Sequence, residues 1–356
     1  MADPDPTPPK RPTRPRIAVR LAVIAGILIV GLALIELGLR PFVSLDFVGP
    51  SAARHDPYYR KSLKPGFAAV VTSQGISYHL AVNSHGFRGP EPSAPLNGCL
   101  LFFGDSMTLG VGVDDEQVYP QLIGRELDRE FGPGSIPIVN TAIAGSGQGR
   151  WLRFLTRDAA ALQPRLIVMQ FCANDFADNL VEGLYHTEAD GTLRESPIPP
   201  QRAVRALQER IEALPIVPYS RIYAVLKQSV RYALERNPPA KHPAAGAHDE
   251  LTYALTEACL RVCAQNGWPV IAIGAQMRES DERIHRLAAL CAAYESEFII
   301  IPASKSLPDL YFPPPNGHWN AGGHALVAER LRTRLEAHPA IRAEESLATT
   351  PPQPAP

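Results

Sequence analysis

The chain has 356 residues, with 35 Lys and Arg against 36 Asp and Glu and a formal net charge of −1. This length suits one large domain or two small ones and is ample for a buried core. The near-neutral charge argues against nucleic acid and against a strongly charged substrate, since both call for a marked excess of one sign. We therefore expect no nucleic-acid partner.

Both ends of the chain have compositions typical of disorder. Residues 1–16 are rich in Pro with Lys and Arg, and residues 339–356 end in small residues and Pro. Neither segment has enough apolar side chains to offset the entropy lost on ordering. We expect a disordered tail at each end, the first of them cytoplasmic.

Residues 17–40 form an apolar segment that includes a fifteen-residue run without charge, LAVIAGILIVGLALI. With its flanks, the segment approaches the roughly 20 apolar residues that a helix needs to cross a bilayer. The basic residues that precede the uncharged run are Lys10, Arg11, Arg14, Arg16 and Arg20. Because few basic residues follow closely, this asymmetry keeps the N-terminus in the cytoplasm and sends the rest of the chain across the membrane.

Two other interpretations of the apolar segment are open. A cleaved signal peptide is disfavoured because no small-x-small cleavage site follows the run, where ELGLRPF stands instead. A buried core helix is disfavoured by the flanking basic residues. We expect a retained single-pass transmembrane anchor, with the following domain on the periplasmic or extracellular side.

The five cysteines are an odd number without a CxxC pair or a zinc-ligand spacing. Cys99 and Cys172 lie in apolar runs, where a small buried side chain is the usual role. Cys259 and Cys263 are poorly placed to bond each other, whereas an oxidising compartment would permit a bridge to Cys291. No metal or other cofactor is expected.

Residues 41–95 are broken by Pro and Gly and predict an irregular or β-rich lead-in, after which short apolar runs alternate with segments of helical spacing. The runs expected as strands are 99–103, 137–140, 165–171, 269–273 and 297–301, and the expected helices are 119–131, 149–162, 248–265, 281–294 and 321–338. This alternation predicts a parallel sheet with helices on both faces. Ligands of such sheets bind beyond the carboxyl ends of the strands.

Residues 178–239 interrupt the alternation. They contain no obvious strand, and two segments of helical character, 202–214 and 220–236, lie between Pro-rich joints. We predict a helical insertion after the third strand. It would form a lid or a partner surface, or it would only extend the scaffold.

The first two strands each lead into a motif suited to nucleophilic catalysis. The first ends in Gly104-Asp105-Ser106, and a serine on a tight strand-to-helix turn has an exposed hydroxyl, although an ordinary helix cap has the same sequence. The second leads to a loop with Gly145, where a backbone N–H could approach a ligand closely, although a plain flexible loop is the alternative.

Two later motifs offer an oxyanion donor and a base. The third strand ends near Asn174, whose neutral amide suits a developing oxyanion. The fifth is followed by His318, which titrates near neutral pH and could take a proton from Ser106 if the strand ends converge. His324 is a rival base, but it lies within the last helical pattern, where packing or capping is the expected role.

The order of these motifs resembles the SGNH/GDSL hydrolase superfamily. Ser106 matches the serine of its block I, Gly145 the glycine of block II, Asn174 the asparagine of block III and His318 the histidine of block V. The resemblance implies a flavodoxin-like three-layer α/β/α sandwich with a central parallel sheet over residues 96–338, and hydrolysis of carboxylic esters through an acyl-enzyme without a metal. It also implies an oxyanion hole formed by the backbone N–H groups of Ser106 and Gly145 and by the Asn174 side chain.

The sequence departs from the family at the residue that orients the base. The family usually has an Asp two or three residues before the histidine, where this chain has Asn316 and Pro315. Three interpretations follow: Asn316 or a backbone carbonyl orients His318, Asp309 folds back to serve, or the activity has decayed. An asparagine that presented its NH₂ group would enforce the wrong histidine tautomer, an exchange that costs about 10⁴ in rate in a serine protease.

We expect an exported serine esterase or acyl hydrolase whose substrate is an ester-bearing small molecule, lipid or glycan. Transfer of an acyl group, such as acetyl, to an envelope glycan is an alternative that uses the same site. A catalytically impaired envelope binding protein is a second alternative, and the presence of all four block residues argues against it.

Overall fold

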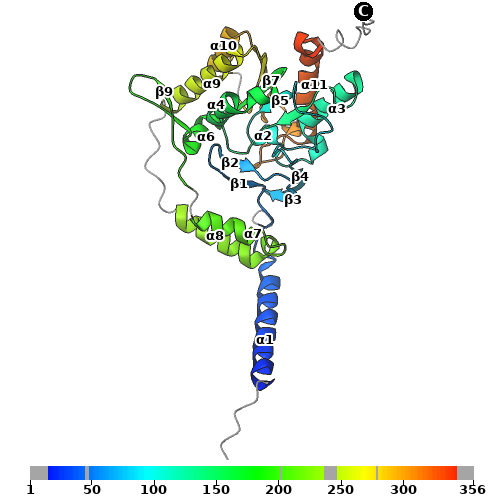
Figure 1. Cartoon of the computed structure of the whole chain (residues 1–356), viewed down its shortest axis with the longest axis vertical. Coiled ribbons are helices and arrows are strands. Elements are labelled where there is room, and N and C mark those ends of the chain that lie inside the picture. Colours follow the sequence, from blue (N-terminus) through cyan, green and yellow to red (C-terminus); the bar gives the residue numbers. More distant parts are fainter. Residues whose placement is uncertain (1–14, 45–47, 201–202, 236–246, 278–279, 343–356) are drawn as a thin grey trace, which may run out of the picture.

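The computed structural model describes residues 15–342 apart from 45–47, 201–202, 236–246 and 278–279 (Figure 1). The two predicted disordered tails lie outside these described residues except at their inner boundaries. The ordered chain extends further at the C-terminal side than predicted, because residues 339–342 form a helical turn. Ile341 in this turn is fully buried in the same apolar cluster as Leu335, which anchors it.

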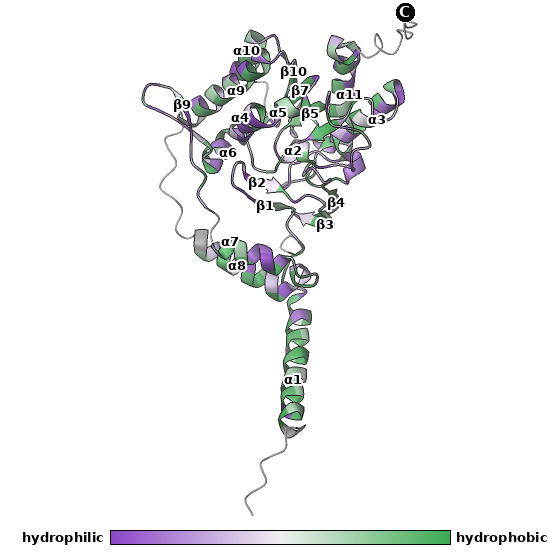
Figure 2. Cartoon of the chain, viewed as in Figure 1, coloured by the Kyte–Doolittle hydropathy of each residue, from purple (hydrophilic) through white to green (hydrophobic). Residues whose placement is uncertain are grey.

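The first described helix, α1 (Pro15–Leu39), stands apart from the globular part of the protein (Figure 1). Its stretch from Ile17 to Leu39 is long and apolar enough to cross a membrane, and its most apolar part is not buried within the protein. Figure 2 shows an almost continuously hydrophobic helix. This exposure rules out the buried core helix and leaves a membrane anchor or a signal sequence.

Five parallel strands form the central sheet in the order β11–β10–β7–β5–β6. Their bounds are β5 (Leu100–Phe103), β6 (Ile138–Asn140), β7 (Leu166–Cys172), β10 (Val270–Ala275) and β11 (Glu297–Ile300). Numbered along the chain, the spatial order is 2-1-3-4-5, which is the flavodoxin-like order. Every residue of β5, β7 and β10 is buried, as expected for a sheet covered on both faces.

Helices cover both faces of this sheet. They are α3 (Tyr119–Phe131), α4 (Gln148–Arg157), α5 (Ala159–Leu162), α6 (Asp175–Glu182), α9 (Ala247–Gln265), α10 (Glu282–Ala293) and α11 (Ala321–Ala337). One apolar cluster joins Trp151 of α4 and Leu255 of α9 to the sheet, and a second joins Ile123 of α3 and Leu331 of α11 to its other face. The predicted three-layer α/β/α sandwich is thus confirmed.

The lead-in forms two antiparallel hairpins. They are β1 (Ala53–Asp56) with β2 (Arg60–Leu63), and β3 (Ala68–Ser73) with β4 (Ile76–Ala81). Arg88, only 1% exposed, follows them and donates to the Asp115 carboxylate (2.9 Å) and to the carbonyls of Gly110 (2.6 Å) and Val113 (2.7 Å). This buried cation fixes the loop that runs past the end of the first central strand.

Residues 178–239 contain strands, contrary to the prediction. β8 (Tyr185–Thr187) and β9 (Leu193–Glu195) pair as an antiparallel hairpin. Gly191 in its turn has a φ of 82°, and the Asp190 carboxylate accepts from the backbone N–H of Thr192. An Asp-Gly turn is a hairpin signal, but three-residue strands are too short to show an alternation of apolar and polar residues.

The two helices predicted in the same segment are present as α7 (Ala203–Glu212) and α8 (Arg221–Glu235). A short 3₁₀ turn at Val217–Tyr219 joins them. In Figure 1 the pair lies between α1 and the globular domain.

All five cysteines lie within the described residues, and all are buried and unpaired. Cys259 and Cys263 are on α9, and Cys291 is on α10. The bridge that an oxidising compartment would permit is therefore not formed.

Candidate active site

Ser106 begins the short helix α2 (Ser106–Leu109), directly after β5. Asp105 caps this helix, because its carboxylate accepts from the backbone N–H of Met107 at 2.8 Å. Gly104 makes the turn sterically feasible: a Cβ at this position would lie 2.1 Å from Thr108 Oγ1 and 2.7 Å from Gln170 Oε1. The strand end, the cap and the tight turn together fix where the Ser106 hydroxyl points.

His318 lies beside Ser106 although 212 residues separate them in the chain. Its Nε2 is 2.8 Å from Ser106 Oγ, and its Nδ1 is 2.9 Å from Asn316 Oδ1. The loop that holds His318 lies between the fifth strand of the sheet and α11. Because the carboxyl ends of parallel strands share one edge, this loop reaches the end of β5.

The orientation of the Asn316 amide follows from a backbone group. The N–H of His318 donates to Asn316 Oδ1 at 3.0 Å, and a backbone N–H can only donate. The atom that faces His318 is therefore the oxygen, and it also accepts from Nδ1–H. This assigns the proton to Nδ1 and leaves Nε2 free to accept from the Ser106 hydroxyl.

The structure places Asn316, rather than Asp309, beside His318. Asn316 is 8% exposed, and its Nδ2 is buried without a hydrogen-bond partner among the described residues. Asp309 is exposed in the 3₁₀ turn Pro308–Leu310, where its main-chain carbonyl accepts from Asn320 Nδ2 at 2.7 Å. Of the three interpretations of the departure from the family, the geometry favours orientation by Asn316.

The environment of His318 keeps its imidazole neutral. Burial lowers the pKa of His318 below its usual value of 6.5, and the Asp105 carboxylate partly opposes this shift. A neutral imidazole with a free Nε2 lone pair can act as a general base at neutral pH.

His324 has a structural role. It is 1% exposed within α11, its Nδ1 accepts from the backbone N–H of Tyr119 at 3.3 Å, and its ring stacks on that of Tyr119. Burial lowers the pKa of His324 to about 3. It packs and caps, as expected from its place in the helix.

Asn174 contacts the carboxylate oxygen of Asp105 that does not cap α2. Its Nδ2 donates to Asp105 Oδ2 at 2.9 Å and to Asp178 Oδ2 at 2.6 Å. An amide NH₂ group has two protons, so both donors are engaged. The side chain expected to stabilise an oxyanion thus contacts Asp105, the neighbour of Ser106 in the chain, and both of its amide protons are bonded to carboxylates.

Gly145 lies close to the Asp178 carboxylate. A Cβ on Gly145 would lie 3.9 Å from Asp178 Oδ1 and 3.6 Å from Lys61 Nζ, and its φ of 61° favours glycine. Lys61, from β2 of the lead-in, donates to the carbonyls of Ala144 (2.6 Å) and Gly145. The lead-in thus fixes the loop that follows β6.

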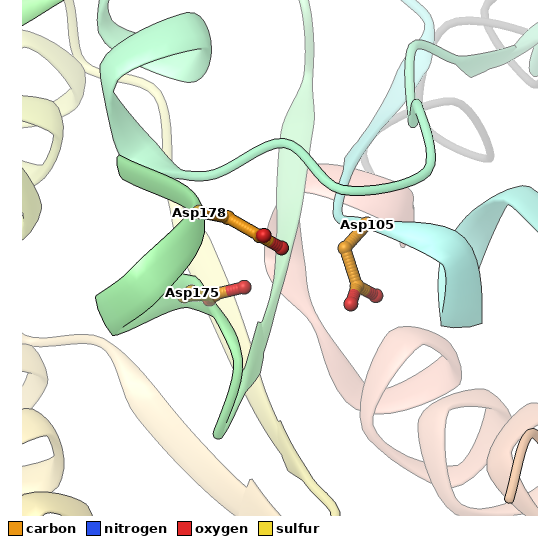
Figure 3. Close-up of side chains that lie close together, drawn as sticks. All are labelled: Asp105, Asp175 and Asp178. Carbon is orange, nitrogen blue, oxygen red and sulfur yellow. The ribbon is translucent and has the colours of Figure 1, made fainter. Parts of the chain in front are cut away.

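Three carboxylates, those of Asp105, Asp175 and Asp178, converge within 4.8 Å of one another (Figure 3). Such a group could supply oxygen ligands to a hard divalent cation. Protein donors already reach it, since Asn174 bonds two of the carboxylates and the third accepts from Gln148 Nε2 at 2.6 Å. An acidic cluster on its own does not establish a metal site.

The same cluster shifts the pKa values of its members. Burial, followed by the charge of Asp105, raises the pKa of Asp175 well above its usual value. Burial also raises the pKa of Asp178, and the bond from Asn174 opposes this rise. The buried carboxyl groups of Asp105 and Asp175 are adjacent, and a negative charge on both would be strongly unfavourable. This favours a protonated Asp175.

Sequence reasoning missed the residues of α6 that support the site. Asp175, Asn179 and Glu182 are buried, and they bond Gln148 Nε2 and Oε1 and the backbone N–H groups of residues 147 and 149. The available signal was the spacing of polar residues at 175, 178, 179 and 182, which puts them on one face of a helix directly after Asn174.

Comparison with known proteins places this geometry in context. The model of the GDSL-like lipase/acylhydrolase family matches residues 102–326, more than half of the chain. A comparison with curated proteins finds no match. Among solved structures, TesA is 15% identical with a TM-score of 0.41, over 67% of this chain and 98% of TesA.

Two further structures are similar at the same level. A variant of Axe2, an acetylxylan esterase from Geobacillus stearothermophilus, is 12% identical with a TM-score of 0.38, over 67% of this chain and 94% of the other. A GDSL-like lipase from Bacteroides thetaiotaomicron is 13% identical with a TM-score of 0.37, over 67% and 88% of the two chains. Structures this distant do not assign the chain to a family. The assignment rests on the family model, whose match contains both Ser106 and His318. The chain therefore belongs to the GDSL-like lipase/acylhydrolase family, a family of enzymes that hydrolyse esters.

Proposed function

We propose that the protein is a serine esterase or acylhydrolase that works through an acyl-enzyme on Ser106. The observation that carries this proposal is the 2.8 Å contact between Ser106 Oγ and His318 Nε2. His318 would take the hydroxyl proton as Oγ attacks the ester carbonyl carbon, and would return that proton to the leaving alkoxide. Water would then attack the acyl-enzyme with His318 again as base, releasing the acid.

Both attacks place negative charge on the carbonyl oxygen of the substrate. The proposed donors to this oxygen are the backbone N–H groups of Ser106 and Gly145 and the amide of Asn174, which come from the ends of three adjacent strands. In this proposal the N–H of Asn174 that is bonded to Asp178 turns to the oxyanion, while the bond to Asp105 holds the side chain in place.

The test is turnover of p-nitrophenyl acetate by the purified full-length protein in detergent. Ser106→Ala and His318→Ala should each abolish activity above the uncatalysed rate, whereas Ser229→Ala, on an exposed position of α8, should match the parent. A fluorophosphonate should label the parent at Ser106 and leave Ser106→Ala unlabelled. Equal turnover in the parent and both site variants would reject the esterase proposal.

We propose also that α1 is retained as a membrane anchor and that the hydrolase domain lies on its outer side. The basic residues before the apolar segment, with few after it, support this orientation. In a cell expressing the chain with a C-terminal reporter, a reporter active only outside the cytoplasm should be active. Activity of a cytoplasm-only reporter at the same position would reject the orientation.

The proposed location makes an ester-bearing lipid or envelope glycan, as well as a small molecule, a candidate substrate. Product analysis distinguishes hydrolysis from transfer, because hydrolysis releases the free acid and transfer leaves the acyl group on an acceptor hydroxyl. We expect the free acid with p-nitrophenyl acetate.

A further inference from the structure

Helices α7 and α8 expose an apolar face, made up of Val204, Leu207, Leu214, Leu226 and Val230. These side chains are 47%, 58%, 55%, 59% and 44% exposed. Positions 204, 207 and 214 recur at helical spacing and so lie along one side of α7 and its C-terminal extension. Single exposed apolar residues are ordinary, but several gathered on one helix pair mark an interaction surface.

One ion pair of this helix pair, Glu212 with Lys227, lies between the two helices. Glu212 of α7 is 7% exposed and accepts from Gln208 Nε2 (2.9 Å), Tyr223 OH (3.1 Å) and Lys227 Nζ (3.1 Å), the last two from α8. A helix pair folded against water normally buries its apolar side and exposes its charges. Here an ion pair lies between the helices while leucine and valine face outward, which is the arrangement expected at an apolar medium.

The position of the pair relative to α1 identifies that medium. Glu36, in the last turn of α1, accepts from the backbone N–H groups of Arg221 (2.7 Å) and Ile222 (3.2 Å) and from Ser220 Oγ (2.8 Å). These groups form the N-terminus of α8, where a carboxylate satisfies unpaired N–H groups and the helix dipole. The contact fixes α8 at the end of the membrane-length helix, and Figure 1 shows the pair lying across that end.

The junction between α1 and the helix pair exposes two large apolar side chains. Phe42, three residues beyond α1, is 84% exposed, and Ile216, between α7 and α8, is 82% exposed. Both exceed the exposure of any large apolar side chain within α1 itself. Arg40 and Arg210 are exposed nearby in the chain, and basic side chains of this kind suit the headgroup region of a membrane.

We propose that the α7–α8 apolar face binds the interfacial layer of the same lipid bilayer that α1 crosses. The continuity with α1 through Glu36 selects a bilayer over a second copy or another protein as the occupant. The helix pair would then lie in the membrane plane and set the orientation of the domain. In Figure 1, α2 and α6, which follow β5 and β7, lie on the side of the sheet that faces α7 and α8, so the candidate active site would be directed toward the lipid surface.

The test uses the full-length protein in phosphatidylcholine/phosphatidylglycerol nanodiscs, with the environment-sensitive fluorophore NBD on one introduced cysteine. The five native cysteines are buried and should not react. Leu226→Cys reports on the apolar face, Ile27→Cys on α1, and Ala293→Cys on α10, at the end of the domain away from α1 (Figure 1). The labels at 226 and 27 should show blue-shifted emission and lose intensity when spin-labelled lipid is included, whereas the label at 293 should show neither change.

Each other outcome overturns the proposal. A label at 226 that behaves like the label at 293 would show that the face is in water. A blue shift at 226 without quenching by spin-labelled lipid would show that protein, such as a second copy, covers it. A label at 27 that lipid does not quench would show that α1 does not cross the bilayer, on which the proposal depends.

A charge placed on the face supplies an independent measurement. In the Val230→Cys background, Leu207→Glu should reduce lipid quenching of the label at 230, because a carboxylate opposes insertion into the interface. Turnover of soluble p-nitrophenyl acetate should stay at the parental value, which shows that the variant is folded. If the parent showed no esterase activity, this would count against the proposed function and would leave the membrane measurement unaffected.

Discussion

Replacing Asn316 by Asp tests how the base is oriented and charged. In the parent, Asn316 Oδ1 accepts from His318 Nδ1 at 2.9 Å, and it supplies no charge to stabilise the imidazolium that would form in the proposed attack by Ser106. An Asp at the same place keeps the acceptor and adds a negative charge. We therefore expect a higher pKa for His318 and a higher kcat.

The size of the effect follows from the geometry. An adjacent opposite charge typically shifts a pKa by about 1 to 3 units, each worth about 1.4 kcal/mol or tenfold in rate. The new carboxylate would be buried, since Asn316 is 8% exposed, and its second oxygen would replace an Nδ2 atom that has no partner among the described residues. Desolvation therefore limits the gain to the lower end, about tenfold.

The gain in kcat should remain far below the factor of about 10⁴ in rate that separates Asp from Asn in a serine protease. That loss arises because the asparagine there enforces the wrong histidine tautomer. Here the backbone N–H of His318 already directs Oδ1 of Asn316 toward the ring and so secures the right tautomer.

The assay is the pH profile of kcat/KM for p-nitrophenyl acetate, with thermal unfolding of each variant as the control for folding. Asn316→Asp should move the acidic limb upward by about one unit. Asn316→Ala should lower kcat, and Asp309→Asn should match the parent. A folded Asn316→Asp protein that lost activity, or whose acidic limb stayed in place, would refute the role assigned to Asn316.

Three further predictions concern the same site. In the parent, kcat/KM should fall on acidification with a midpoint below 6.5, because burial lowers the pKa of His318 and only the neutral ring accepts a proton; a midpoint above 6.5 in the pH profile would contradict this. Gly104→Ala should destabilise the protein by about 1–3 kcal/mol in urea unfolding and lower kcat, because the new methyl group overlaps Thr108 and Gln170; unchanged values would disprove the steric argument. Asn174→Ala should lower kcat by about 10²–10³, whereas Asp178→Ala should spare or raise it by releasing the amide; a comparable loss in both variants would show that Asp178 does more than hold Asn174.

The sheet and its covering helices could be predicted because their signals are local and strong. Strands such as β7, LIVMQFC, are apolar apart from Gln170, and a buried parallel strand needs no more than this to be recognised. The hairpin of β8 and β9 was missed because three residues per strand give no periodicity, and its stability comes partly from Arg153, which donates to the carbonyls of Leu184 (3.1 Å) and Ser196 (2.6 Å). That contact joins distant segments and is invisible in sequence.

At the site, Ser106 and His318 could be predicted because each follows a strand, and strand ends meet at one edge. The bond from Lys61 of β2 to the Gly145 carbonyl could not be predicted, since it depends on how the lead-in folds back onto the loop that holds Gly145. The engagement of both Asn174 protons by carboxylates also escaped prediction, because a sequence identifies a donor but not what it donates to.

The five buried cysteines have a consequence for how the domain is made. Burial raises the pKa of the thiols of Cys99, Cys263 and Cys291 to about 12, and it also raises those of Cys172 and Cys259 well above their usual value. A protonated, inaccessible thiol is a poor nucleophile, so oxidants and thiol reagents should leave the folded domain untouched. The protein would need neither an oxidase nor a disulfide isomerase to mature, and adding dithiothreitol to the folded protein should leave its thermal unfolding midpoint unchanged.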